Sequence, residues 1–293
     1  MPVATAPVRV CDAGGWTDTW FAGSGQVCNL AVRPGVRVEV TARRDAEVTF
    51  AEPPTPLLEA VAAEAGATGV HIDVRSGVPP GSSLGTSAAV TVALLAALGV
   101  PRGELAARAH RVETERLGLQ SGVQDQAAAA HGGASWIEVD YPSARRGSIA
   151  VPPAAWRALD GRLLTVFLGE HRSSTVHDEV ITGLATDPSA LEDLRACARA
   201  AAVALSAGDL TAYGGALVAN TEAQRALHPA LVSDAAQALL DAAATSGALG
   251  WKVNGAGGPG GTVTIVCGDR RPEVPVGTVL DLRLSRQGVR VTR

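Results

Sequence analysis

The sequence predicts an α+β protein with two lobes, because strand-like and helix-like segments occur in groups of mixed order. Residues 36–40 and 70–74 alternate apolar and polar side chains, as half-buried strands do. Residues 88–98 are apolar nearly all round, which indicates a buried helix. A stretch with several prolines at residues 141–156 follows, so we expect lobes at residues 1–150 and 151–293.

The other elements are predicted in chain order from the same patterns. Residues 105–117 form an amphipathic helix, and Gly118 is placed to end it. Beyond the boundary, residues 163–168 are an apolar run typical of a buried strand. Helical patterns then cover residues 190–206, 210–226 and 231–246, and strands are expected at residues 262–266 and 279–284.

Composition and charge restrict the class of protein. The 293 residues are 46% hydrophobic, which is enough to bury a sizeable core. A formal net charge of −4 gives no general attraction to nucleic acid or anionic membrane. The longest apolar run, residues 88–100, is shorter than the roughly 20 residues that a membrane span needs. We expect a cytoplasmic monomer or homodimer that binds small molecules, without nucleic acid or membrane partners.

The four cysteines are spread along the chain, and no two form a C-x-x-C pair. This spacing supports neither a structural zinc site nor a disulfide framework. We expect buried thiols at Cys11, Cys28, Cys197 and Cys267.

A loop rich in glycine and hydroxyl residues stands directly before the helix at residues 88–98. Glycine lets the backbone approach an anion closely, and a helix N-terminus adds partial positive charge. No G-K-[ST] follows, so this is not a Walker loop. Read alone, the segment also fits a capped helix after a glycine turn. The residues expected to hold ATP phosphates are Pro80, Gly81, Ser82, Ser83, Gly85, Thr86 and Ser87.

Three carboxylates downstream are candidates for the chemistry. Glu113 and Glu115 lie on the predicted helix, where a carboxylate can hold Mg²⁺ or orient a hydroxyl. Two acids on a helix are more often a solvated face. Asp125 is followed closely by four alanines, a context suited to a tightly packed functional acid.

Two further segments contain closely spaced glycines. Residues 252–261 precede an apolar strand, and their backbone can pass close to a ligand, although a plain hairpin loop fits too. Near the start, Arg9 and Asp18 flank a Gly-Gly turn. Asp18 can accept hydrogen bonds from sugar hydroxyls, and Arg9 can stabilise a carboxylate or phosphate. As residues of a lone turn, both would lie at the surface.

Together these four regions resemble the GHMP kinase superfamily. An Ala-Pro-x-Arg strand, a P-P-G-S-S-L-G-T-S-A-A loop, an Asp-Gln after an acidic helix and a Gly-Ala-Gly-Gly loop occur in the family's order. Residues 14–19, GGWTDT, resemble fucokinases, and residues 169–174, GEHRSS, resemble heptose-7-phosphate kinases. The resemblance implies an N-terminal lobe like ribosomal protein S5 domain 2 and a ferredoxin-like C-terminal lobe.

The resemblance also implies a role for individual residues. Asp125 would contact the hydroxyl to be phosphorylated, with Arg9 beside it, and Ser87 and Glu113 would bind Mg²⁺. ATP and Mg²⁺ are therefore the expected cofactors. The residues implied near the substrate are Gly15, Trp16, Asp18, Gly122, Arg172, Gly257 and Gly258.

The expected reaction is transfer of the ATP γ-phosphoryl group to a sugar hydroxyl, the anomeric one if the chain is of fucokinase type. Gly15 stands where galactokinases carry a glutamate, which argues against galactose. One alternative keeps the chemistry but takes a heptose phosphate or a non-sugar alcohol, with His171 and Arg172 near the substrate phosphate. An alternative of another class is an inactive protein that senses sugar and nucleotide. Pro259 interrupts the last glycine run, and its effect stays open.

Overall fold

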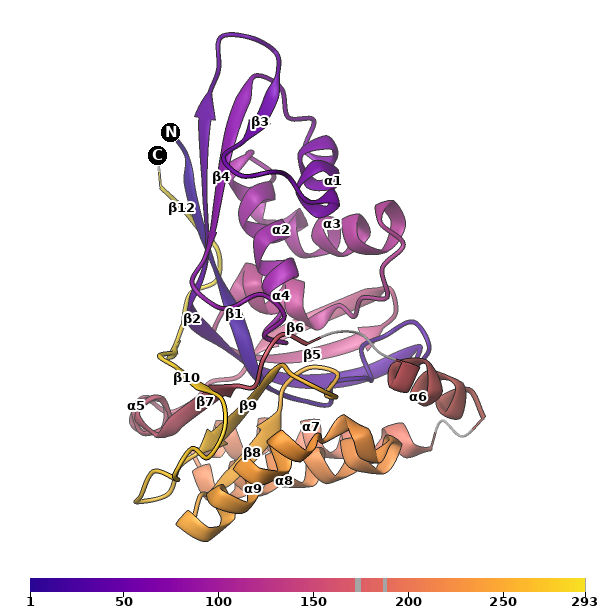
Figure 1. Cartoon of the computed structure of the whole chain (residues 1–293), viewed down its shortest axis with the longest axis vertical. Helices are drawn as coiled ribbons and strands as arrows, with labels where there is room; N and C mark the ends of the chain where they lie inside the picture. Colours follow the sequence, from indigo (N-terminus) through magenta and orange to yellow (C-terminus); the bar gives the residue numbers. More distant parts are fainter. Residues whose placement is uncertain (172–174, 187–188, 293) are drawn as a thin grey trace.

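The computed structural model describes residues 1–171, 175–186 and 189–292, and these fold around two β-sheets. Figure 1 shows one group of helices beside the upper sheet and a second group at the opposite end of the molecule. The mixed α and β content agrees with the α+β class predicted from the sequence. No described helix is long and apolar enough to cross a membrane.

The larger sheet is organised around one long strand. Its order is β12(Arg290–Thr292)-β1(Val3–Ala13)-β2(Ser24–Ala42)-β4(Val70–Ser76)-β3(Val48–Phe50). The first half of β2 pairs with β5 (Ala134–Asp140), which pairs with β6 (Ser143–Ser148), and β11 (Arg283–Leu284) also pairs with β2. Only the β3–β4 pairing is parallel among these described strands.

The smaller sheet is antiparallel and belongs to the second half of the chain. Its order is β10(Thr278–Leu280)-β7(Leu163–Phe167)-β9(Thr262–Val266)-β8(Gly250–Val253). All five residues of β9 are buried, as expected for a central strand with neighbours on both sides.

Two groups of helices accompany the sheets. The first comprises α1 (Pro56–Glu64), α2 (Thr86–Ala97), α3 (Leu105–Arg111) and α4 (Gln124–His131), with a 3₁₀ turn at Arg102–Glu104 and a π-helix at Val112–Arg116. The second comprises α5 (Pro153–Arg162), α6 (Thr175–Thr186), α7 (Ala190–Ala207), α8 (Leu210–Leu227) and α9 (Asp234–Ser246), with a 3₁₀ turn at Pro229–Leu231. Most of α2 is buried, as its uniformly apolar sequence predicts.

Most predicted elements are confirmed, and two differ in an informative way. Residues 279–284 form two short strands, β10 and β11, which belong to different sheets. The helix expected at residues 105–117 changes from α to π geometry at Val112, and Gly118 follows it with a left-handed φ of +63°. All four cysteines are free and buried, as expected.

The main hydrophobic core is continuous between the two halves. Apolar residues of β1, β2 and α2 share one cluster with Ala201 on α7 and with Tyr213 and Leu217 on α8. The end of the chain returns to the larger sheet through β11 and β12, beside the N-terminus in Figure 1. The division at residue 150 stays a prediction.

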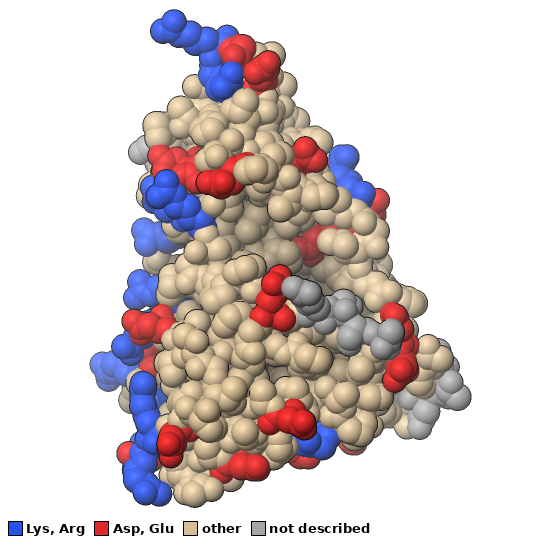
Figure 2. Space-filling view, viewed as in Figure 1, with Lys and Arg blue, Asp and Glu red and all other residues tan. Residues whose placement is uncertain are grey.

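Charged side chains are unevenly distributed over the face seen in Figure 2. Arginines gather mainly along its left edge, the side on which Figure 1 places β12 and β2. A groove between β2, β4 and β12 is lined by four arginines, Arg33, Arg37, Arg75 and Arg290.

Candidate active site

The predicted phosphate loop forms one wall of a pocket of about 360 Å³ at the start of α2. Gly85 precedes the helix with a left-handed φ of +73°, and the first turn of α2 carries no acidic side chain. The partial positive charge of the helix N-terminus can therefore attract an anion, and no acidic side chain of that turn itself opposes it. All the expected phosphate-loop residues except Pro80 line this pocket.

Backbone atoms from several elements hold the loop in place. Leu84 O accepts a hydrogen bond from Arg9 N on β1 at 2.9 Å, and Ser82 O accepts one from Thr262 Oγ1 on β9 at 2.8 Å. Gly81 O accepts a third from His171 N at 2.8 Å. Because both sheets contribute, the loop has a preformed shape.

An ion pair between Arg9 and Asp125 lies at one end of this pocket. Arg9 Nε donates to Asp125 Oδ1 at 2.7 Å and Nη2 donates to Oδ2 at 3.3 Å, so the guanidinium holds both carboxylate oxygens. Arg9 Nη1 also donates to Ser83 O in the loop. The side chain of Arg9 is 5% exposed and that of Asp125 is 26% exposed, so the acid keeps an open edge.

The charge of Arg9 is fixed by its neighbours. Burial alone would lower the pKa of the Arg9 guanidinium, but the carboxylates of Asp12 and Asp125 outweigh it and raise that pKa. Arg9 is therefore a permanent cation. The surface position that a lone turn would give Arg9 is wrong, and so is a surface position for Asp18, which is 3% exposed.

Glu113 lies on the π-helix and is buried, whereas Glu115 on the same turn is exposed. Glu113 Oε2 accepts hydrogen bonds from Ser121 Oγ and Gln126 Nε2, each at 2.6 Å. The other oxygen, Oε1, is buried without a hydrogen-bond partner. Burial raises the pKa of Glu113, the hydroxyl of Ser121 opposes that rise, and the charge of Asp125 adds to it.

These features decide whether the site fits a magnesium ion. A buried carboxylate oxygen without a partner is costly, and a cation beside it would satisfy it. The hydroxyl of Ser87 lies close enough to Glu113 to lower its pKa, so both predicted ligands lie together. Among the described residues no three His, Cys, Asp or Glu side chains form a metal cluster. Mg²⁺ that bridges phosphates needs only one or two carboxylates, so the residues fit.

A second pocket of about 360 Å³ adjoins the first and shares Arg9, Ser87 and Asp125 with it. Carboxylates of Asp12, Asp18 and Asp125 line it, and so do aromatic and imidazole rings. The lining rings are Trp16, Trp20, Phe21, His171 and His177. Carboxylates beside aromatic faces can bind the hydroxyls and the apolar face of a small polyol.

Asp18 is held at the floor of this pocket by α4. Its Oδ2 accepts a hydrogen bond from Gln124 N at 3.1 Å, and a Cβ on Gly122 would lie 2.1 Å from the same oxygen. Any side chain at position 122 would therefore displace the Asp18 carboxylate. Burial, with a further contribution from the charge of Asp125, raises the pKa of Asp18 to about 6.

Trp16 and His177 close one side of the second pocket. The two rings stack with centroids 5.8 Å apart and an interplanar angle of 24°. Trp16 has a φ of +77°, and its Nε1 donates to Ala256 O at 3.1 Å. His171 lies edge-on to His177, with centroids 5.3 Å apart.

The other predicted substrate residues are distributed as follows. Gly15, Trp16, Asp18 and Gly122 line the second pocket. Gly255 and Ala256 line both pockets, whereas Gly257 lies against Leu231 O and Gly258 lies near His177. Arg172 lies outside the described residues.

Among the titratable lining residues, Asp12 and His177 were not predicted from the sequence. Asp12 lies between the Ala-Pro-x-Arg segment and the Gly-Gly turn, and this position is the signal that could have found it. His177 lies on α6 and reaches the pocket through tertiary packing alone, so no local pattern predicts it.

Comparison with known proteins relates part of the chain to a known family. Residues 54–133 match the family model described as the GHMP kinases N terminal domain. Over 199 residues the chain is 30% identical to a D-glycero-alpha-D-manno-heptose 7-phosphate kinase of Campylobacter jejuni. The chain is therefore similar to GHMP kinases, and the family model covers its residues 54–133. The matched segment covers 63% of this chain and 58% of that relative, which is less than two thirds of the relative's length.

Other GHMP kinases share shorter segments or only the fold. A mevalonate kinase of Methanothermobacter thermautotrophicus is 42% identical over 78 residues, 25% of each chain. The crystal structure of a D-glycero-D-manno-heptose 1-phosphate kinase from Bacteriodes thetaiotaomicron superposes with a TM-score of 0.79 at 19% identity, covering 100% of this chain and 99% of that one. The predicted GHMP kinase fold is thereby confirmed. These relatives agree better with the heptose alternative than with the fucokinase-type expectation.

Proposed function

We propose that this chain is an ATP-dependent kinase that phosphorylates a hydroxyl of a sugar phosphate, with a heptose phosphate as the acceptor. One observation carries the proposal: the Arg9–Asp125 ion pair lies where the glycine-loop pocket meets the carboxylate-lined pocket. A nucleotide in the first pocket and an acceptor in the second would meet at that pair. Catalysis of phosphoryl transfer is mostly such positioning together with charge stabilisation.

The chain's own groups account for each part of the reaction. The acceptor hydroxyl hydrogen-bonds to the open edge of Asp125, and its oxygen attacks the γ-phosphorus of ATP. The bond from that phosphorus to the β,γ-bridging oxygen breaks, ADP leaves, and the hydroxyl proton passes to the Asp125 carboxylate. Arg9 holds Asp125 in place and stabilises the negative charge of the transferring group.

The phosphates of ATP would lie against residues 81–87, with the N-terminus of α2 behind them. Ser87 and Glu113 would hold Mg²⁺, and the unpartnered Glu113 Oε1 supports this assignment. An ion held there would supply positive charge that stabilises the phosphate oxygens.

The acceptor is the finer part of the proposal. Asp18 can accept hydrogen bonds from sugar hydroxyls, and His171 and His177 in their protonated forms can donate to a substrate phosphate. The two heptose kinases compared above are named for a 7-phosphate and a 1-phosphate, so the acceptor hydroxyl is the variable to test.

The test is acceptor-dependent release of ADP from ATP and Mg²⁺. The panel holds heptose 7-phosphate, heptose 1-phosphate, the free heptose, fucose, mannose and galactose, and ³¹P NMR locates the new phosphate. We expect the highest kcat/KM with a heptose phosphate. A higher kcat/KM for free fucose, with the phosphate on the anomeric oxygen of the product, would instead support a fucokinase-type enzyme. Binding of sugar and nucleotide without ADP release would instead favour a sensor.

A further inference from the structure

Lys252 is the only lysine of the chain, and it is 1% exposed. It lies on β8, where Nζ donates to Gln224 Oε1 at 2.9 Å and to Val253 O. Asp12 Oδ1 lies 3.9 Å from the same nitrogen. A buried ammonium group is costly unless it is paired, so a lysine at this position calls for a reason beyond packing.

Asp12 is fully buried at an irregular point of β1. The β1–β2 register shifts between Val10 and Ala13, and Cys11 has a left-handed φ of +55°, uncommon for a residue with a side chain. Such strained positions concentrate at functional sites. The bulge directs the Asp12 carboxylate toward the end of β8.

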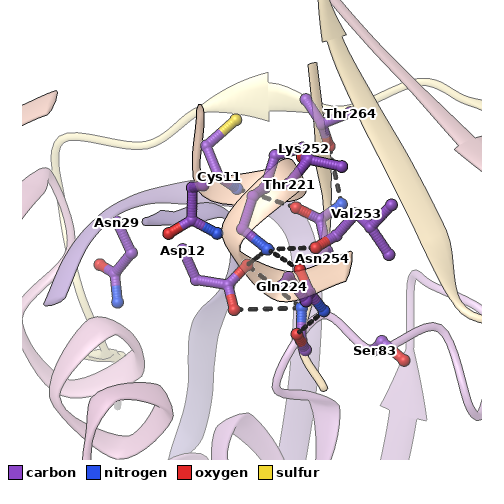
Figure 3. A network of polar contacts seen from close by, with 12 residues as sticks. Cys11, Asp12, Asn29, Ser83, Thr221, Gln224, Lys252, Val253, Asn254 and Thr264 are labelled. Carbon is purple, nitrogen blue, oxygen red and sulfur yellow. Dashed lines mark hydrogen bonds and ion pairs between the residues drawn. The ribbon is translucent and has the colours of Figure 1, made fainter. Parts of the chain in front are cut away.

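Two successive residues just after β8, Asn254 and Gly255, hold this bulge. Gly255 N donates to both oxygens of Asp12, at 3.1 and 3.0 Å, and Asn254 Oδ1 accepts a hydrogen bond from Cys11 N at 2.9 Å. Figure 3 shows Lys252, Asp12 and Gln224 converging at this point. The second glycine loop is therefore tied to the first strand directly above the active site.

Charges of alternating sign continue from this junction to the reacting centre. Arg9 Nη1 lies 3.8 Å from Asp12 Oδ1, and the Nε of the same guanidinium donates to Asp125 at 2.7 Å. Arg9 is thus shared between two carboxylates. Because Lys252 partly balances the charge of Asp12, Asp12 attracts Arg9 less strongly than an unbalanced carboxylate would.

We propose that Lys252 and Asp12 are a positioning pair that sets the orientation of Arg9, and through it the orientation of the Asp125 carboxylate. This inference rests on the proposed kinase function. Without Lys252, Asp12 draws Arg9 away from Asp125. Without Asp12, Arg9 loses the contact that holds it on the side facing β8. Neither residue needs to touch ATP for these effects.

Kinetics of Lys252→Met, Asp12→Asn and the double variant test the pair. Each single change should lower kcat at least about tenfold and leave KM for ATP within about threefold. In the double variant both charges are gone, so its kcat should be no lower than that of the worse single variant. Thr165→Val is the control, because it removes a buried 2.9 Å contact to Thr264 in the same sheet. It should lower Tm while kcat stays within about twofold.

A second measurement does not depend on turnover. With ¹³C,¹⁵N-labelled lysine, the side chain of Lys252 gives the only lysine signals of the chain, and these can be followed against pH. Burial lowers the pKa of Lys252 and Asp12 raises it, so Asp12→Asn should move the titration to lower pH. Wild-type protein that releases no ADP with any acceptor would end the kinase proposal, whereas this titration would still test the pair.

The outcomes that overturn the inference are distinct. Fully additive losses in kcat for the double variant, or a titration unmoved by Asp12→Asn, would show that the two residues act separately. If Asp12→Asn fails to fold, Lys252→Met carries the kinetic test, and a wild-type kcat in that variant overturns the pair. A loss of kcat in Thr165→Val as large as in Lys252→Met would reduce the effect to general stability.

Discussion

Gly85 and Asp125 are in contact across the start of α2. A Cβ on Gly85 would lie 2.9 Å from Asp125 Cγ and 3.0 Å from its Oδ2, and Gly85 itself has a φ of +73°. Gly85, the loop residue directly before α2, therefore also forms one side of the space that holds the Asp125 carboxylate. The position of the loop and the position of the acid cannot be changed independently.

Gly85→Ala should disturb the phosphate loop and the position of the Asp125 carboxylate together. A left-handed alanine costs about 1 kcal/mol or more of stability, and the new methyl group would displace the Asp125 carboxylate. Since a displacement of about 1 Å can cost 10²-fold, kcat should fall by about that factor. Gly66→Ala is the matched control, because its φ is +64° and nothing lies within 4 Å of an added Cβ. Equal kcat values for the two variants would contradict the contact.

Asp125→Asn should remove turnover while nucleotide binding remains. The amide keeps a hydrogen-bond acceptor for Arg9 but cannot take the proton of the acceptor hydroxyl. We expect kcat to fall about 10³-fold with the Kd for ATP within about threefold. Asp269→Asn, at a side chain that is 99% exposed, is the control. Near-normal activity of Asp125→Asn would exclude Asp125 as the base.

The sequence predicts those parts of the site whose residues lie close together in one short segment of the chain. Residues 81–87 combine glycines, hydroxyls and a following helix within one stretch, so their arrangement is local. Asp125 and Arg9 belong to family motifs, which is why the pair could be anticipated at all. The burial of Glu113 could not be predicted from a regular helix pattern. The change to π geometry at Val112 sets which face of the turn is buried.

The parts that could not be predicted depend on contacts distant in sequence. Asp12 and Gly255 are 243 residues apart, and only the packing of β1 against the end of β8 brings them together. The sequence predicts one strand at residues 279–284, but their assignment to two sheets depends on where the chain crosses between the sheets. Periodicity reports which residues are buried, and not against which partner.

Acceptor binding should depend on pH through Asp18. Its pKa of about 6 in the folded protein means that the carboxylate is ionised only above that pH. KM for the acceptor should therefore fall as pH rises through about 6. The folded protein holds this proton more tightly than the unfolded chain does. The contribution of Asp18 to the free energy of unfolding therefore declines as the pH rises from about 4 to about 6.

Asp18→Asn isolates this effect from the nearby imidazoles of His171 and His177. In the variant the inflection in KM near pH 6 should disappear, because the amide does not titrate. The decline of Tm over the same pH interval should become shallower. An inflection that persists in Asp18→Asn would assign the pH dependence to another group.

Glu113→Gln should weaken the dependence of activity on Mg²⁺ without destabilising the fold. The amide loses the charge that a cation needs, so the Mg²⁺ concentration for half-maximal activity should rise about tenfold or more. Because burial raises the pKa of Glu113, the ionised carboxylate is unfavourable in the metal-free protein, and Tm at pH 8 should not fall. Glu115→Gln, on the same turn but exposed, should leave both quantities unchanged. A Glu113→Gln protein with wild-type Mg²⁺ dependence would remove Glu113 from the metal site and leave its unpartnered oxygen without that explanation.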